Sequence, residues 1–172
     1  MDFKIIDDND QEVSQGEIGE IIIKSPTNMI KYHGDEDATK YALLDGGWLR
    51  TGDLGYIDED GFVFFKQRKK RVVKVSGVGV FPTEIENLIQ SVQGVKEVCA
   101  ISIPDDRLIS AIKVFVVADY FDEEEMRQLI LEKCRKYLIR WAVPKEIEFR
   151  KELPLTMLGK VNFRQLQDEE NK

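Results

Sequence analysis

Alternating segments and turn signals dominate the first part of the chain. Residues 3–7 read FKIID, with apolar and polar side chains in alternation, and the DDND at 7–10 is typical of a turn. Residues 16–25 read GEIGEIIIKS and predict a second strand with a β-branched centre, so we expect the two strands to form a hairpin. Segment 35–44 has acidic residues at its start and apolar ones near its end, which predicts a short helix.

The pattern changes after residue 80. In 81–92, FPTEIENLIQSV, apolar residues recur at helical spacing behind a proline, and 122–139 predicts a second amphipathic helix with Asp122 as its N-cap. Residues 95–104 and 144–154 predict strands. The nearly continuous apolar run at 110–119 indicates a central strand buried on both faces. The tail, 158–172, ends in a polar segment that we expect to be frayed.

Together these elements predict an α+β fold in two parts. Residues 1–69 form a β-rich part, and residues 70–172 form a small α+β domain with a central sheet flanked by helices. The boundary coincides with a basic run, in which six of the nine residues from 66 to 74 are Lys or Arg.

Composition narrows the function classes. The chain has 172 residues and a formal net charge of -7, which argues against general nucleic-acid binding in spite of the basic run. It has no apolar run near the roughly 20 residues of a membrane span and no signal-peptide pattern, so we expect a cytoplasmic protein. Cys99 and Cys134 lack metal-binding spacing and are expected to be reduced thiols. The single histidine, His33, excludes a His-based triad or a multi-histidine metal site, and no metal site is predicted.

Three stretches carry a specific resemblance when they are taken together. They are GWLRTGDLGYIDEDGFVFF (47–65), QRKKRVVKVSGVGVFPTEIE (67–86) and LPLTMLGKVNFRQL (153–166). In this order and at these separations the chain resembles the C-terminal third of the AMP-forming adenylating enzymes, which include acyl-CoA synthetases, luciferases and the adenylation domains of peptide synthetases. Within this superfamily, the sequence of these motifs is most similar to those of bacterial medium- and long-chain fatty acid–CoA ligases.

The resemblance implies two half-reactions. A carboxylate attacks the α-phosphate of ATP to give an acyl-adenylate and pyrophosphate, and a thiol, usually that of CoA, then displaces AMP. ATP or AMP, Mg²⁺ and CoA are the ligands implied, with Mg²⁺ held mainly outside this chain. On this basis residues 1–69 would be the last β-rich subdomain of the large adenylate-forming domain, and 70–172 the C-terminal lid domain.

The resemblance also implies roles for particular residues. Thr51, Gly52 and Asp53 match the family's T-G-D, whose aspartate accepts hydrogen bonds from the ribose hydroxyls, and a carboxylate offers the two acceptor oxygens that this needs. Arg68 matches a ribose-binding arginine, although Gln67 stands before it where glycine is usual. Lys70 aligns with the hinge residue. Arg71 stands where many members of the family have aspartate, so the resemblance does not indicate which ion pairs form beside the hinge.

Two further segments match mobile parts of the lid. Gly77, Val78 and Gly79 match the loop that borders the pantetheine tunnel, where residues without a Cβ allow a close approach. Lys160 matches the adenylation lysine. Its positively charged ammonium sits at the end of a long side chain and would stabilise the negative charge that develops at the α-phosphate. The other basic residues of the run, Lys69, Arg71 and Lys74, are expected on solvated surfaces, with some paired to acidic groups.

The family's Gly-rich phosphate loop and acyl pocket have no counterpart in this sequence. We therefore expect a fragment that is inactive alone, that works with a missing N-terminal adenylate-forming domain, and that could self-associate through apolar surface left exposed. A carrier-protein-loading or peptide-synthetase adenylation domain is an alternative, because the acceptor thiol cannot be read here. A non-catalytic remnant or partner-binding lid is a second alternative.

Overall fold

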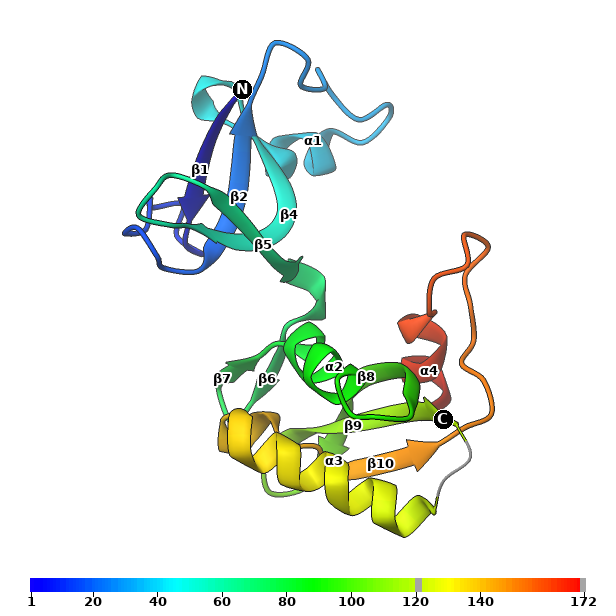
Figure 1. The fold of residues 1–172 in the computed structure, drawn as a ribbon. Coiled ribbons are helices and arrows are strands. Elements are labelled where there is room, and N and C mark those ends of the chain that lie inside the picture. The colour runs from blue at the N-terminus through cyan, green and yellow to red at the C-terminus, as the bar shows by residue number, and fades with distance from the viewer. Residues whose placement is uncertain (120–121, 171–172) are drawn as a thin grey trace. The chain divides into compact units, whose positions relative to one another are not determined.

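The computed structural model describes residues 1–119 and 122–170, and it divides into two compact units, Met1–Arg71 and Val72–Lys172 (Figure 1). The division falls after Arg71, two residues beyond the boundary expected from sequence. Each unit has its own sheet and its own buried core. The architecture is α+β, as predicted.

The first unit is built on a five-stranded antiparallel sheet. The sheet consists of β1 (Asp2–Ile6), β2 (Gly19–Lys24), β3 (Leu43–Leu44), β4 (Trp48–Ile57) and β5 (Val63–Arg68). Four of the strands lie in the order β1-β2-β4-β3, and β5 also pairs with β4. The predicted hairpin is confirmed, because β1 and β2 pair antiparallel with Phe3 opposite Ile23. Isoleucines of these two strands, Ile5, Ile6, Ile21 and Ile22, supply most of the core.

Short helices complete the first unit. The predicted helix is α1 (Glu36–Ala42), and the side chain of Asp35 caps it by accepting a hydrogen bond from the backbone N–H of Ala38 at 2.9 Å. Two single turns follow at η1 (Asp45–Gly47) and η2 (Lys69–Arg71). Residues 66–71 of the basic run thus end β5 and form the turn at the end of the unit, and Lys74 belongs to the second unit.

The second unit contains a three-stranded sheet of order β10-β9-β8, with β8 (Val95–Asp105), β9 (Ile109–Ala118) and β10 (Glu146–Phe149). Strand β9 pairs antiparallel with β8 and parallel with β10, so the predicted central strand is confirmed. A separate hairpin is made by β6 (Val73–Val75) and β7 (Val78–Val80). The helices are α2 (Pro82–Gln90), α3 (Glu123–Tyr137), the single turn η3 (Arg140–Ala142) and α4 (Phe163–Glu170).

Both faces of the three-stranded sheet are covered. Alternate residues of β9, such as Ile112 and Val114, join a core cluster with side chains of α2 and α3, while Phe115 joins a second cluster with Leu166 of α4. This alternation explains why 110–119 is apolar almost throughout. The two free cysteines lie in different clusters, Cys134 in the first and Cys99 in the second.

Helix α3 begins as its sequence predicts. The carboxylate of Asp122 accepts hydrogen bonds from the backbone N–H groups of Glu124 and Glu125, at 3.0 and 2.9 Å. These bonds satisfy two of the donors that a helix leaves free at its first turn.

The expectation of a frayed tail is wrong for residues 163–170, which form α4. Leu166 is fully buried, and the side chain of Gln167 exchanges two hydrogen bonds with the backbone of Ser102 in β8. At the end of the helix, Glu170 lies 2.5 Å from the ammonium of Lys113, which is itself almost fully buried in β9. Contacts to the sheet therefore order a segment whose own composition is polar.

Candidate functional site

The Thr51-Gly52-Asp53 segment lies in the middle of β4, where the pairing register with β2 shifts. The hydroxyl of Thr51 donates a hydrogen bond to the carbonyl of Ile21 in β2 at 2.6 Å and accepts one from the backbone N–H of Asp53 at 3.1 Å. Gly52 has a φ of +72°, a left-handed conformation that favours glycine. The segment is thus fixed by its own side chain and by the neighbouring strand.

Asp53 and Arg68 form a pair across two strands. They are directly opposite each other in the β4–β5 register, and Nη1 of Arg68 lies 2.9 Å from Oδ1 of Asp53. The same guanidinium donates a hydrogen bond to the carbonyl of Thr51 at 3.2 Å. Oδ1 of Asp53 is buried and faces the Arg68 guanidinium, although the pair lacks the alignment of a hydrogen bond. An ionised carboxylate has two oxygens and about four lone-pair sites, so Asp53 keeps acceptor capacity for a ligand hydroxyl beside this ion pair.

A buried carboxylate, Glu20 of β2, lies beneath this segment. Its side chain is 1% exposed, and its Oε1 accepts a hydrogen bond from the backbone N–H of Gly52 at 3.2 Å. Its Oε2 accepts hydrogen bonds from Nη1 of Arg50 at 2.9 Å and from the ammonium of Lys69 at 3.0 Å. Glu20 was not predicted from the sequence as a site residue. The available signal was its position two residues before Ile22, which places a charge on a buried face of the strand.

Lys69 corrects an expectation from the sequence. We expected it on a solvated surface, but its ammonium lies 3.0 Å from Glu20 and 2.9 Å from Asp8. Burial disfavours the charged ammonium, but the hydrogen bonds with Asp8 and Glu20 outweigh this and raise the pKa of Lys69 above its ordinary value. Lys69 is therefore anchored inside the first unit. Lys74, in contrast, is exposed as predicted.

The hinge candidate, Lys70, is the residue after this anchor. It is exposed and lies in the single turn η2. Three residues later, Val73 packs against the core cluster of the second unit. The chain thus passes from contacts of one unit to contacts of the other within residues 70–72.

Ser76 and Gly77 form the tight connection between β6 and β7, and Val78 and Gly79 lie within β7. Ser76 and Gly77 have φ values of +50° and +80°, as in a two-residue hairpin turn that requires left-handed residues. Gly77 is therefore needed by the turn itself. Gly79 is exposed, and a Cβ there would make only an ordinary contact with Val72 at 3.7 Å. The β6–β7 turn presents little side-chain bulk.

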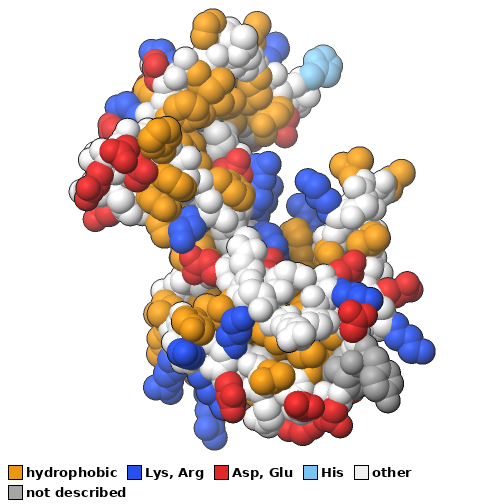
Figure 2. Space-filling model, viewed as in Figure 1, with side chains coloured by type: hydrophobic (Ala, Val, Ile, Leu, Met, Phe, Trp, Pro, Cys, Tyr) orange, Lys and Arg blue, Asp and Glu red, His pale blue; other side chains and the backbone are white. Residues whose placement is uncertain are grey.

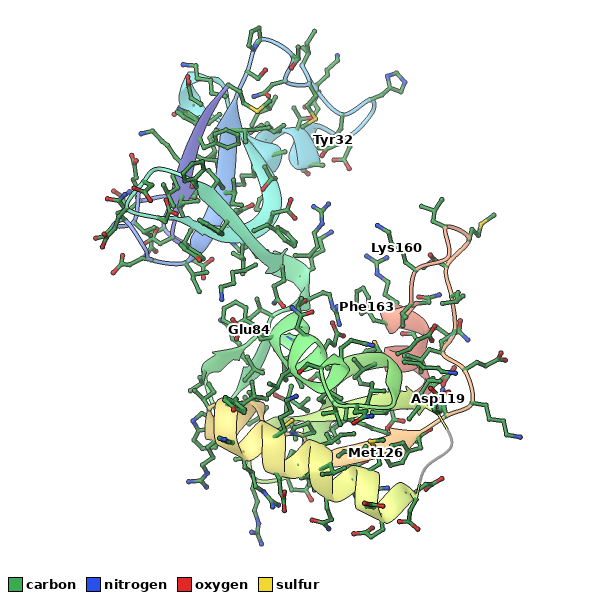
Figure 3. The ribbon with its side chains drawn as sticks, in the orientation of Figure 1. Tyr32, Glu84, Asp119, Met126, Lys160 and Phe163 are labelled. Atoms are coloured by element: carbon green, nitrogen blue, oxygen red, sulfur yellow. The ribbon has the colours of Figure 1, made fainter. Side chains whose placement is uncertain are left out.

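Lys160 lies on a closed loop between β10 and α4 (Figure 3). Leu155 and Val161 pair at its base, and the backbone N–H of Thr156 donates to the carbonyl of Lys160 at 2.7 Å. The hydroxyl of Thr156 accepts from the N–H of Lys160 at 3.2 Å. Lys160 is exposed, and so are Met157 and Leu158 at the tip, where Figure 2 shows hydrophobic side chains.

The structure brings some candidate residues together and leaves others apart. Thr51, Gly52, Asp53 and Arg68 form one contact set in the first unit. In the second unit, the β6–β7 turn and the Lys160 loop lie at opposite ends of the three-stranded sheet (Figure 1). Among residues 1–119 and 122–170, no group of three or more His, Cys, Asp or Glu is arranged to hold a metal ion. None of the helices described is both long and apolar enough to span a membrane.

Comparison with known proteins assigns this arrangement to a family. Residues 84–160 match the model of the AMP-binding enzyme C-terminal domain. A long-chain-fatty-acid–CoA ligase from Salmonella typhimurium is 42% identical over 166 residues, which are 96% of this chain and 29% of that protein. A fatty acid–[acyl-carrier-protein] ligase, ScoC, from Streptomyces coeruleorubidus is 36% identical over 96% of this chain and 31% of that protein.

Solved structures agree with the sequence matches. The crystal structure of ATP-bound MatB from Rhodopseudomonas palustris superposes with a TM-score of 0.87 at 31% identity, over 98% of this chain and 33% of that one. The chain therefore spans about a third of the length of the proteins it matches.

Proposed function

Because this chain belongs to the AMP-forming adenylating enzymes, we propose that it forms the C-terminal part of an ATP-dependent acyl-CoA synthetase. The observation that supports this best is the ion pair of Asp53 and Arg68 on adjacent strands, which places a carboxylate and a guanidinium side by side. Asp53 would accept hydrogen bonds from the ribose hydroxyls of ATP, and Arg68 would donate to ribose oxygens.

The proposed reaction has two steps. A carboxylate oxygen of the fatty acid attacks the α-phosphorus of ATP, and the bond to pyrophosphate breaks. The sulfur of the CoA thiol then attacks the carbonyl carbon of the acyl-adenylate, the bond to the AMP oxygen breaks, and a thioester forms. In the first step the Lys160 ammonium would offset the negative charge that builds on the α-phosphate oxygens.

The arrangement of the second unit supports an alternation between the two steps. The Lys160 loop and the β6–β7 turn lie at opposite ends of one sheet, so a single orientation cannot aim both at the same point (Figure 1). A rotation would exchange them, and Lys70 would absorb it; the contacts of Lys69 with the first unit and of Val73 with the second support this.

A carrier protein is the second candidate for the thiol acceptor. The ScoC relative, whose name gives an acyl-carrier-protein as acceptor, supports this alternative. The two candidates predict different products, a free acyl-CoA or an acylated carrier. Assaying the enzyme that contains this chain with CoA and with a phosphopantetheinylated carrier protein separates them.

The chain by itself should not form an acyl-adenylate. It contains no Gly-rich phosphate loop, so we propose that Mg-ATP and the acid are held mainly by a further adenylate-forming portion. We expect no fatty-acid-dependent release of pyrophosphate from the purified chain with Mg-ATP. Release above the acid-free background would contradict this.

The role of Lys160 is tested in the full-length enzyme that contains this chain. Lys160→Ala should slow acyl-adenylate formation by about 10²-fold or more, because a preorganised charge contact is worth about 3 kcal/mol in the transition state. Conversion of supplied acyl-adenylate to thioester should continue at nearly the normal rate. Lys151→Ala, which removes another exposed lysine before the loop, is the control and should affect neither step. Equal damage to both steps in Lys160→Ala would refute the assignment.

A further inference from the structure

The position of Glu20 beneath the candidate nucleotide site leads to a further inference, which rests on the proposed function. We propose that Glu20 is a positioning residue that sets the geometry of the Asp53–Arg68 pair. Its carboxylate does not touch either member. It contacts Gly52, the residue before Asp53, and Lys69, the residue after Arg68, at 3.2 and 3.0 Å.

The two oxygens of Glu20 act on different strands. Oε1 holds the N–H of the left-handed Gly52 in β4, and Oε2 holds the ammonium that follows the end of β5. One side chain thus fixes a neighbour of each partner in the pair, across the strands that carry them. Arg50, also bound to Oε2 at 2.9 Å, adds a second cation on the β4 side.

Burial makes this anchor strong. A carboxylate that is 1% exposed is costly unless donors surround it, and Glu20 has three of them. Its two cations also have carboxylates nearer the surface, because Lys69 pairs with Asp8 and Arg50 with Asp10. Without Glu20, these surface carboxylates would draw both cations outward and move the ends of the strands that carry the pair.

Two variants and one control test the positioning. Glu20→Met keeps the volume and removes both acceptors, whereas Glu20→Gln keeps an acceptor oxygen for Gly52 but loses the charge that holds Arg50 and Lys69. Glu12→Gln, which breaks the exposed ion pair with Lys4 in the same unit, is the control. The first readout is backbone amide hydrogen exchange in this chain, measured by NMR.

We expect the Gly52 amide to exchange at least about tenfold faster in Glu20→Met, because a hydrogen bond to a buried charged group is worth more than a neutral one. In Glu20→Gln the amides of 67–70 should exchange faster while Gly52 stays protected, so this variant still tests the proposal if Glu20→Met fails to fold. Exchange in Glu20→Gln that matches the Glu12→Gln control at 67–70 would overturn the proposal.

The second readout links positioning to the ligand. In the full-length enzyme, the KM for ATP and for 2′-deoxy-ATP would be compared in wild type and Glu20→Gln. We expect wild type to prefer ATP and the variant to lose most of that preference, a change that general destabilisation would not cause. If wild type shows no preference, the ribose role of Asp53 fails, and the exchange data still decide whether Glu20 holds the pair. A preserved preference in Glu20→Gln would overturn the positioning role.

Discussion

Asp105 ends β8, at a turn where three donors converge on one carboxylate. Its Oδ1 accepts hydrogen bonds from the N–H groups of Arg107 and Leu108, both at 2.8 Å, and its Oδ2 lies 2.7 Å from the ammonium of Lys145. The hydrogen bond from Lys145, followed by those from the backbone, lowers the pKa of Asp105 from 3.8 to about 2. The charged form is therefore favoured in the folded state.

This pKa shift predicts a pH dependence of the second unit. Because the folded pKa lies below the unfolded one, the stabilisation is complete above about pH 4 and is lost as the pH falls toward about 2. Asp105→Asn should lower the free energy of unfolding at pH 7 and flatten its fall between these pH values. Urea unfolding at several pH values measures both effects, with the exposed neighbour change Asp106→Asn as control. An acid dependence in Asp105→Asn as steep as in wild type would contradict the prediction.

At this same scale, the sequence showed only part of the candidate site. Thr51, Gly52, Asp53 and Arg68 stand in recognisable motifs, so their neighbourhood in one unit could be anticipated. Lys69 could not, because a lysine in a basic run is usually solvated, and the one signal for Glu20 was its spacing from Ile22. Only the fold shows that Glu20 is buried and that the half-buried Lys69 reaches it.

Helix α4 illustrates, at the scale of elements, where pattern reading succeeds and fails. The helix predicted in 81–92 and the strand predicted in 110–119 are confirmed as α2 and β9, because the first has a clear apolar face and the second is apolar almost throughout. The stretch FRQLQDEE has few apolar residues, and its helix is stabilised by contacts with the sheet, notably through Leu166. Tertiary contacts decide the structure of such weakly patterned segments.

Leu166→Ala tests how much α4 contributes to the second unit. The side chain is fully buried, so we expect a loss of about 2–5 kcal/mol in the free energy of unfolding. Chemical denaturation measures it, and Arg164→Ala, on the exposed side of the same helix, is the control with little expected change. A loss below about 1 kcal/mol would mean that the site relaxes around the smaller side chain.

For the molecule as a whole, the first unit exposes aromatic side chains on and beside β5. Phe62, Phe64 and Phe65 are 66%, 43% and 60% exposed, and Phe64 stacks on Tyr56 at 5.1 Å between ring centroids. Strand β5 pairs only with β4, so its other edge is open within this sheet. Phe64 and Phe65 are consecutive in β5 and therefore point to opposite faces, so both faces present exposed aromatic area of the kind that another protein surface often covers.

This surface predicts concentration-dependent self-association of the chain. Phe62→Ser together with Phe65→Ser should reduce it, because the substitutions remove apolar area that association would bury. Light scattering over a concentration series measures the change. Ile109→Ser, at an 85% exposed position in the second unit, is the matched control. A chain that stays monomeric at high concentration would contradict the prediction.

The loop that carries Lys160 has a consequence for the speed of the proposed reaction. Its backbone is closed by its own hydrogen bonds, in which Thr156 contacts the N–H and the carbonyl of Lys160, and it is held between the pairing at its base and α4. Its conformational entropy is therefore already lost before it meets a substrate. To reach the reacting phosphate, the loop would need one rigid-body displacement and no folding of its own backbone. The time before each adenylation step would then be set by the rate of motion at the hinge.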